Sequence, residues 1–101
     1  MRPIKFRIRA LRDMEEIKEY IAEHDENASK RVLLHLSRRI QSLGKSPLIG
    51  KKADMSGVRV AFPTKYPYRI YYLLTDREVV ILHVRHSSRG ALQKGDLDEH
   101  D

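Results

Sequence analysis

Two consecutive runs near the end of the chain constrain its fold most strongly. The first is Tyr66-Pro67-Tyr68-Arg69-Ile70-Tyr71-Tyr72, and the second extends from Val79 to Arg89 and begins with four aliphatic residues. Aromatic and β-branched residues favour strands, and the polar segment 75–78 between the runs is typical of a tight turn. The pattern predicts an antiparallel hairpin that brings arginine, tyrosine and histidine together on one sheet.

The earlier part of the chain predicts one strand and two helices. Residues 2–9 alternate between apolar and basic side chains, as in a half-buried strand. From Leu11 to Ile21 the apolar residues are three or four apart, which indicates an amphipathic helix. The same spacing from Ala28 to Leu43 predicts a second helix, with Asp25 or Asn27 as its N-cap.

The second helix is expected to end at Gly44, before Pro47. Residues 45–57 are rich in glycine, proline and polar residues and predict a loop. Alternation from Val58 to Phe62 then predicts another strand, which precedes the hairpin. The expected fold is α+β, with an N-terminal strand, a helical hairpin and a three-stranded antiparallel meander, and with the helices packed on one face of the sheet.

Alternation along the strands divides their residues between two faces. The face expected against the helices carries Ile4, Phe6, Ile8, Val58, Val60, Ile70, Tyr72, Leu82 and Val84. The opposite face is expected to carry Lys5, Arg7, Arg9, Arg59, Arg69, Tyr71, His83 and Arg85. Guanidinium groups pair with phosphate or carboxylate groups, so this cationic and aromatic face predicts an acidic partner.

Length and composition limit the remaining possibilities. The chain has 101 residues, a net charge of +6 and no cysteine. We expect one domain over residues 1–90 and a flexible acidic tail over residues 91–101, which could shield the basic face. The sequence predicts no disulfide, no membrane span and no signal peptide, so a cytoplasmic location is expected.

Few catalytic chemistries suit these residues. His83 and His86 lie three apart on a strand without a nearby carboxylate, so neither a metal site nor any other cofactor is expected. The chain has no glycine-rich phosphate-binding loop. Ser87 and Ser88 do not lie in a sequence motif that activates a serine as a nucleophile. Metal-free RNA cleavage remains open because histidine and arginine can supply its acid, base and cations. Its candidate residues are His83, His86, Arg59, Arg69 and Arg89.

Several segments together resemble a known family over nearly the whole chain. They are Ala10 to Ile17 with Tyr20-Ile21, Leu43 to Pro47 with Gly50, Arg59, Tyr66 to Tyr72, and Ile81 to His86 with Arg89. In this order they resemble the ParE/RelE superfamily of bacterial toxin–antitoxin toxins, and more closely its ParE, or plasmid-stabilisation, branch. That family's fold is the one predicted above from periodicity.

The resemblance implies a toxin of a type II toxin–antitoxin system that a cognate antitoxin neutralises by binding. ParE-branch toxins poison DNA gyrase, which would make this chain a binding inhibitor and not an enzyme. RelE-branch toxins cut messenger RNA on the ribosome, and the segment after His86 lacks the aromatic residue that they use there. Gyrase inhibition is therefore our expectation, and ribosome-dependent cleavage is the alternative. The residues expected to face the target are Arg59, Arg69, Tyr71, His83, Arg85 and Arg89.

Overall fold

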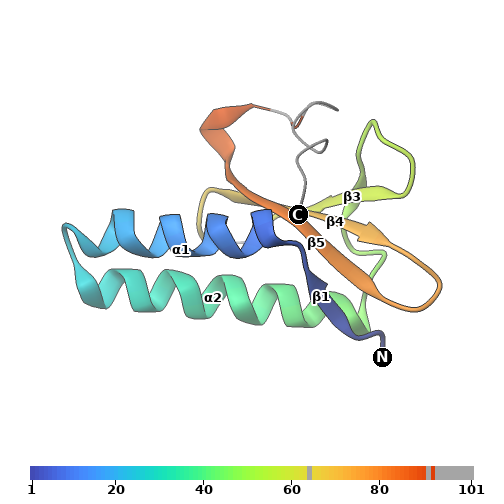
Figure 1. Ribbon diagram of the computed structural model, residues 1–101, viewed down its shortest axis with the longest axis horizontal. Helices are drawn as coiled ribbons and strands as arrows, with labels where there is room; N and C mark the ends of the chain where they lie inside the picture. Colours follow the sequence, from blue (N-terminus) through green and yellow to red (C-terminus); the bar gives the residue numbers. More distant parts are fainter. Residues whose placement is uncertain (64, 91, 93–101) are drawn as a thin grey trace.

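The computed structural model of the chain describes residues 1–63, 65–90 and 92. Its elements are β1 (Ile4–Phe6), α1 (Ile8–Ala22), α2 (Glu26–Lys45), β2 (Lys51–Lys52), β3 (Val58–Ala61), β4 (Tyr68–Leu74), β5 (Val79–His86) and the 3-10 helix η1 (Ser87–Arg89). Figure 1 shows α1 and α2 side by side, next to the twisted sheet. The predicted α+β class, the helical hairpin and the meander are confirmed. Within these described residues, no helix is long and apolar enough to cross a membrane.

The first strand is shorter than predicted, and the first helix begins earlier. Pairing between β1 and β5 stops at Phe6, which is opposite Ile81. Arg7 is extended at the N-cap of α1, and its N–H donates to the Ile81 carbonyl at 2.9 Å. The helix then starts at Ile8, where the prediction placed the end of a strand. Ile8 is 48% exposed, so its predicted burial under the helices is wrong.

The helical hairpin is closed by local polar contacts. Asp25 is the N-cap of α2, because its side chain accepts the Ala28 N–H at 3.0 Å. The Ser29 hydroxyl donates to the Lys18 carbonyl at 2.7 Å and so joins the two helices. Buried residues of both helices form one core with the sheet: Ala10, Val32, Leu36, Ile40 and Leu43. Their three- and four-residue spacing is the one that predicted the helices.

The sheet has five strands in the order β1-β5-β4-β3-β2. β1 pairs with β5 in parallel, and the other neighbours are antiparallel. The β4–β5 hairpin is confirmed, and its turn is held by Thr75, whose N–H donates to the Glu78 carbonyl at 3.1 Å. The two-residue strand β2 lies within the segment predicted as a loop. Its alternation is too short to be visible in the sequence.

A bulge in β5 changes which residues face the helices. Tyr72 pairs with Ile81 and Tyr71 with His83, so Leu82 has no partner on β4. Such an extra residue breaks the alternation of a strand. Consequently Ile81 and Val84 are in the core under the helices, whereas Leu82 belongs to a second apolar cluster on the other face. The prediction that placed Leu82 with Val84 is wrong for this reason.

The faces of β3 are the reverse of those predicted. Val58 and Val60 belong to the outer cluster with Tyr71, Leu82 and the buried Leu92. Ala61, one residue further along β3, packs in the core under the helices. Alternation defines two faces but cannot tell which one is covered, and here both faces carry an apolar cluster. The predicted acidic tail lies outside the described residues, except for Leu92.

The loop before β2 is fixed to the sheet by one tyrosine. The Tyr72 hydroxyl donates to the Pro47 carbonyl at 2.6 Å and accepts the Gly50 N–H at 3.1 Å. Burial raises the pKa of Tyr72, although the Gly50 hydrogen bond and the Arg59 and Arg39 charges act to lower it. A Cβ atom at Gly50 would lie 2.5 Å from the Tyr72 hydroxyl oxygen. Glycine is therefore required at position 50 by close packing.

Candidate functional site

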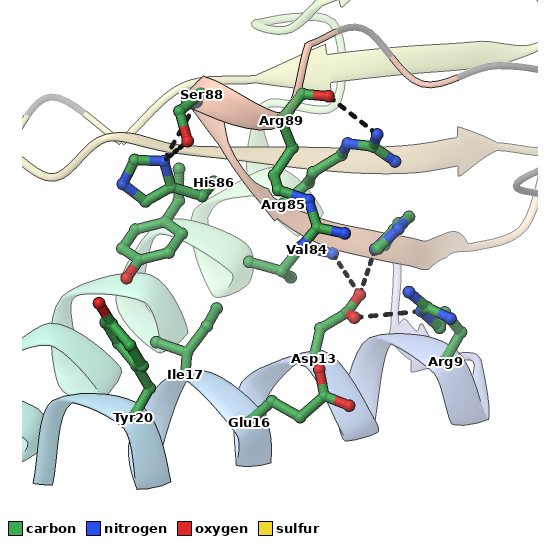
Figure 2. Close-up of a pocket in the computed structure, with 12 residues that line it drawn as sticks. Arg9, Asp13, Glu16, Ile17, Tyr20, Val84, Arg85, His86, Ser88 and Arg89 are labelled. Carbon is green, nitrogen blue, oxygen red and sulfur yellow. Dashed lines mark hydrogen bonds and ion pairs between the residues drawn. The ribbon is translucent and has the colours of Figure 1, made fainter. Parts of the chain in front are cut away.

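The last strand extends beyond its parallel neighbour, and α1 covers the exposed edge. β1 pairs with β5 only as far as Ile81, and β5 continues to His86. Without a further strand, the backbone N–H groups at this edge need other acceptors. Asp13 on α1 provides one, because its Oδ2 accepts the Val84 N–H at 2.9 Å. Figure 2 shows the Asp13 side chain pointing from α1 towards β5.

Asp13 is the centre of a buried polar group. Its side chain is 5% exposed, as is the whole of His83. Oδ2 also accepts the Nδ1–H of His83, and Oδ1 accepts Arg9 Nε–H at 3.2 Å. The carboxylate thus receives hydrogen bonds from an arginine, a histidine and a backbone amide, which offset the cost of its burial. The contacts fix the position of α1 relative to β5.

A cleft of about 590 Å³ opens between α1 and the end of β5. Figure 2 shows Glu16, Ile17 and Tyr20 rising from α1 on one side, and Arg85, His86 and η1 on the other. The residues that line it are Arg9, Asp13, Glu16, Ile17, Tyr20, Tyr68, His83, Val84, Arg85, His86, Ser88 and Arg89. The cleft combines an aromatic and aliphatic wall with a cationic one. It can accommodate a group that is both apolar and anionic.

His86 is exposed at the mouth of this cleft and is held in one orientation. Its Nδ1 accepts the Ser88 backbone N–H at 3.1 Å and lies 2.8 Å from the Ser88 hydroxyl. A backbone N–H can only donate, so Nδ1 carries no proton, and neutral His86 is protonated at Nε2. In this tautomer Nε2 is a hydrogen-bond donor. His86 therefore has no lone pair at Nε2 with which to act as a base, and only its doubly protonated form could transfer a proton from Nε2.

The aromatic wall is built around Tyr68. Its ring meets the His86 ring edge to face, with centroids 5.3 Å apart. Burial, and secondarily the nearby Tyr20, raises the pKa of Tyr68. The phenol is thus neutral across the physiological pH range. Tyr20 itself is 68% exposed, so it presents a large aromatic surface to solvent beside the cleft.

The predicted site residues fall into two groups. His83, Arg85, His86 and Arg89 all line the cleft. Arg85 also supports η1, because its Nη2 donates to the Arg89 carbonyl at 2.9 Å, as Figure 2 shows. His83 is buried against Asp13, so its predicted exposure on an open face is wrong.

The other predicted residues lie outside the cleft. Arg59 donates from Nη1 to the Gly50 carbonyl at 2.7 Å and thereby supports the loop before β2. Arg69 lies opposite Arg85 in the sheet and packs over the Phe62 ring, with 5.9 Å from Cζ to the centroid. Tyr71 is 4% exposed, so its predicted position on an open face is wrong. Its hydroxyl accepts the Leu92 N–H at 3.1 Å.

Several cleft residues were not predicted from the sequence. They are Arg9, Asp13, Glu16, Ile17 and Tyr20 on α1, Tyr68 on β4, Val84 on β5, and Ser88 on η1. Asp13 had a detectable signal, because it lies three residues after Ala10 and four before Ile17, within the apolar stripe of the helix. A carboxylate in such a stripe indicates a buried partner.

No group of three or more His, Asp or Glu residues within the described ranges is placed to hold a metal ion.

Solved structures with a similar fold come from toxin–antitoxin systems. The chromosomal ParDE system of P. aeruginosa contains a chain that superposes with a TM-score of 0.76 at 17% identity, over 85% of this chain and 96% of that one. The toxin–antitoxin complex RelBE2 of Mycobacterium tuberculosis contains another, with a TM-score of 0.65 at 25% identity, over 84% and 96% of the respective chains. The fold therefore corresponds to the ParE/RelE class of toxin.

Sequence comparison then specifies the family. Residues 4–90 match the family model described as ParE toxin of type II toxin–antitoxin system, parDE. Y4kP of Sinorhizobium fredii, a protein named as a candidate toxin, is 32% identical over 84 residues, which cover 83% of this chain and 86% of that protein. The chain belongs to the ParE toxin family.

Proposed function

We propose that this toxin acts by binding and inhibiting DNA gyrase, and that a cognate antitoxin neutralises it by binding in turn. The observation that carries the proposal is the match of residues 4–90 to the ParE family model. Resemblance to the ParE branch implies gyrase as the target, whereas the RelE branch implies messenger RNA. The RelBE2 relative is named as a toxin–antitoxin complex, which supports an antitoxin partner for this chain.

The geometry supports inhibition by contact more than catalysis. Acid–base catalysis needs a proton acceptor, a proton donor and cations around one reacting group. Of the candidate nuclease residues, Arg59 is engaged with the Gly50 carbonyl and Arg69 lies over Phe62, both away from the cleft. His83 is engaged with Asp13. Dispersed cations with exposed aromatic surface suit the binding of an acidic protein partner.

A supercoiling assay with purified, antitoxin-free toxin tests this proposal. We expect loss of gyrase supercoiling or accumulation of cleaved plasmid, and recovery when antitoxin is added. Arg85→Gln together with Arg89→Gln should weaken inhibition, because both cations line the cleft. The control is Arg31→Gln with Arg38→Gln, which removes the same charge from exposed positions on α2. Full gyrase activity in the presence of folded, antitoxin-binding toxin would contradict the proposal.

Cleavage of messenger RNA on the ribosome is the second candidate, and the position of His86 favours it. His86 is exposed beside Arg85 and Arg89, and its Nε2 is the protonated nitrogen. In its doubly protonated form, His86 could transfer the Nε2 proton to a leaving oxygen and become neutral, while the arginines bind the phosphate. Primer extension on messenger RNA from translating ribosomes would reveal such cleavage.

His86→Ala separates the two candidates. Loss of a proton-transfer group reduces cleavage about 100-fold or more, whereas a contact inhibitor loses much less. His24→Ala is the matched control, because His24 is exposed in the turn between α1 and α2 and away from the cleft. Unchanged toxicity in the His86 variant would contradict the nuclease and leave gyrase inhibition in place.

A further inference from the structure

The loop between α2 and β2 presents two adjacent aliphatic side chains to solvent. Leu48 is 66% exposed and Ile49 is 54% exposed. The residues on either side of this pair are both fixed to the sheet, because the Tyr72 hydroxyl donates to the Pro47 carbonyl and accepts the Gly50 N–H. The two aliphatic side chains are therefore held at the surface by an anchored backbone.

Basic side chains stand on both sides of the aliphatic pair. Lys45 precedes it at the end of α2, and Lys51 and Lys52 follow it on β2; all three are exposed. The half-buried Arg2 is close to the same end of α2, because its N–H donates to the Gly44 carbonyl at 3.0 Å. We call the exposed surface the basic turn, and its residues are Lys45, Leu48, Ile49, Lys51 and Lys52.

Charge is distributed unevenly between the two ends of the helical hairpin. Residues 27–53, which extend from the first turn of α2 to the end of the basic turn, contain seven Lys and Arg and no Asp or Glu. Residues 13–26 contain seven Asp and Glu against a single Lys, a net charge of −6. Figure 1 shows the turn between α1 and α2 at one end of the hairpin and the N-terminus beside the other. This polarity turns the basic end towards an anionic surface.

The combination of lysine and aliphatic side chains selects the kind of partner. A nucleic acid presents phosphates to the lysines, but its base faces are stacked inside, away from Leu48 and Ile49. The centres of protein interfaces favour Trp, Tyr and Arg, and the basic turn contains none of them. An anionic bilayer presents phosphate headgroups at its surface and hydrocarbon directly beneath them. It therefore complements both kinds of side chain in the basic turn.

We propose that the basic turn binds the toxin reversibly to anionic lipid bilayers. Leu48 and Ile49 enter the boundary between headgroups and acyl chains, and the three lysines pair with the lipid phosphates. Lysine suits this position because its apolar stem can lie along hydrocarbon while its ammonium group stays in the polar layer. No residue of the basic turn lines the cleft, so the inference goes beyond the proposed function and does not depend on it.

Co-sedimentation of the purified full-length toxin with lipid vesicles tests the proposal. One set of vesicles is pure phosphatidylcholine, and the other contains about one third phosphatidylglycerol, which is anionic. We expect binding to the anionic vesicles at about 0.1 M salt and its loss at about 1 M, where charges are screened beyond about 3 Å. Equal binding to both sets, or no binding to the anionic set by toxin that circular dichroism shows to be folded, would overturn the proposal.

The aliphatic pair is tested by Leu48→Ser with Ile49→Ser. We expect affinity for the anionic vesicles to fall about 25-fold, because half-burial of each aliphatic side chain contributes about fivefold. The control is Leu11→Ser with Leu34→Ser, which changes two leucines that are 53% and 52% exposed outside the basic turn and should alter affinity less than about twofold. Wild-type affinity in the Leu48 and Ile49 variant would mean that charge alone binds, as it would to a nucleic acid, and would overturn the assignment to lipid.

The lysines are tested by Lys45→Gln, Lys51→Gln and Lys52→Gln together. Each lysine near an anionic bilayer contributes about fivefold, so affinity should fall about 100-fold. Lys30→Gln with Arg31→Gln and Arg38→Gln removes the same charge from exposed positions on α2 and should cost less than about fivefold. Equal losses would assign binding to total charge and overturn the role of the turn.

A protein occupant would give a different result. The toxin would then ignore both sets of vesicles, while Leu48→Ser with Ile49→Ser would reduce toxicity in cells, and this outcome would overturn the lipid assignment. The vesicle assay contains neither gyrase nor antitoxin, so its result is independent of the proposed function.

Discussion

Two buried polar side chains each tie a distant segment to the sheet, but by different means. Asp13 joins α1 to β5 through a charged carboxylate whose donors include the side chains of Arg9 and His83. Tyr72 joins the loop before β2 through a neutral hydroxyl whose two partners are backbone groups. Both are buried, yet only the first stands beside the cleft. The position of α1 beside the cleft therefore depends on a charged side chain, whereas the position of the loop before β2 depends on a neutral, closely packed contact.

Removing the Asp13 carboxylate beside the cleft should have the largest effect on stability. Asp13→Ala leaves the Val84 N–H and the His83 Nδ1–H without their acceptor, so we expect the free energy of unfolding to fall by about 3 kcal/mol. Urea denaturation measures this change. Glu16→Ala, an exposed position on the same helix, is the control and should change stability by less than about 0.5 kcal/mol. Similar losses in both variants would contradict the buried role of Asp13.

Changing the shape of the loop should have the next largest effect. A Cβ atom at Gly50 would lie 2.8 Å from the Val60 carbonyl oxygen, a backbone atom that cannot move aside cheaply. Gly50→Ala should therefore cost about 2 kcal/mol of stability in urea denaturation. Ser46→Ala, an exposed substitution at the end of α2, is the control. Wild-type stability for Gly50→Ala would mean that the loop is not packed on Tyr72.

Removing only the loop's hydroxyl should cost less. Tyr72→Phe keeps the ring but leaves the Pro47 carbonyl and the Gly50 N–H without that partner, and we expect a loss of about 1.5 kcal/mol. Tyr20→Phe is a matched control because its hydroxyl is on a largely exposed side chain. If the two substitutions were equivalent in thermal or urea unfolding, the hydroxyl of Tyr72 would not anchor the loop.

The smallest expected effect is a difference between wild-type protein and Tyr72→Phe in how stability falls at alkaline pH. Burial raises the pKa of Tyr72 above that of an unfolded tyrosine, which is about 10. Above pH 10 the unfolded state loses its proton first, so stability falls as pH rises. Below pH 10 the contribution is fully present. Wild-type protein should therefore lose stability more steeply than Tyr72→Phe between about pH 10 and 11, by about 1 kcal/mol at most. Parallel curves from urea denaturation at each pH would contradict this.

Local patterns were sufficient to predict much of the fold. The β4–β5 hairpin, both helices and the Asp25 cap depend on neighbours a few residues apart, and each is confirmed. The errors concern relations between distant segments. The early start of α1 follows from where β1 stops pairing with β5, and alternation in residues 2–9 contains no such information.

The site was only partly predictable for the same reason. Its β5 residues were found because histidine and arginine stand out at the end of an apolar run. Its α1 residues come from a helix that is distant in sequence, and only Asp13 carried a signal, as a charge within an apolar stripe. Tyr71 was assigned to an open face because alternation cannot anticipate that Leu92 returns to cover it. Burial on the second face depends on a contact across more than twenty residues.

The bulge at Leu82 also determines how this chain should be compared with relatives. Leu82 is the residue of β5 without a partner on β4, whereas the pairs on both sides of it are regular. Deleting it would leave Ile81 opposite Tyr72 and His83 opposite Tyr71 in an unbroken ladder. An alignment gap of one residue at this position therefore preserves the equivalence of Arg85 and His86, whereas a gap placed elsewhere in the strand would match them to the wrong residues. Among homologous toxins, one-residue insertions and deletions in this strand should concentrate at the position of Leu82.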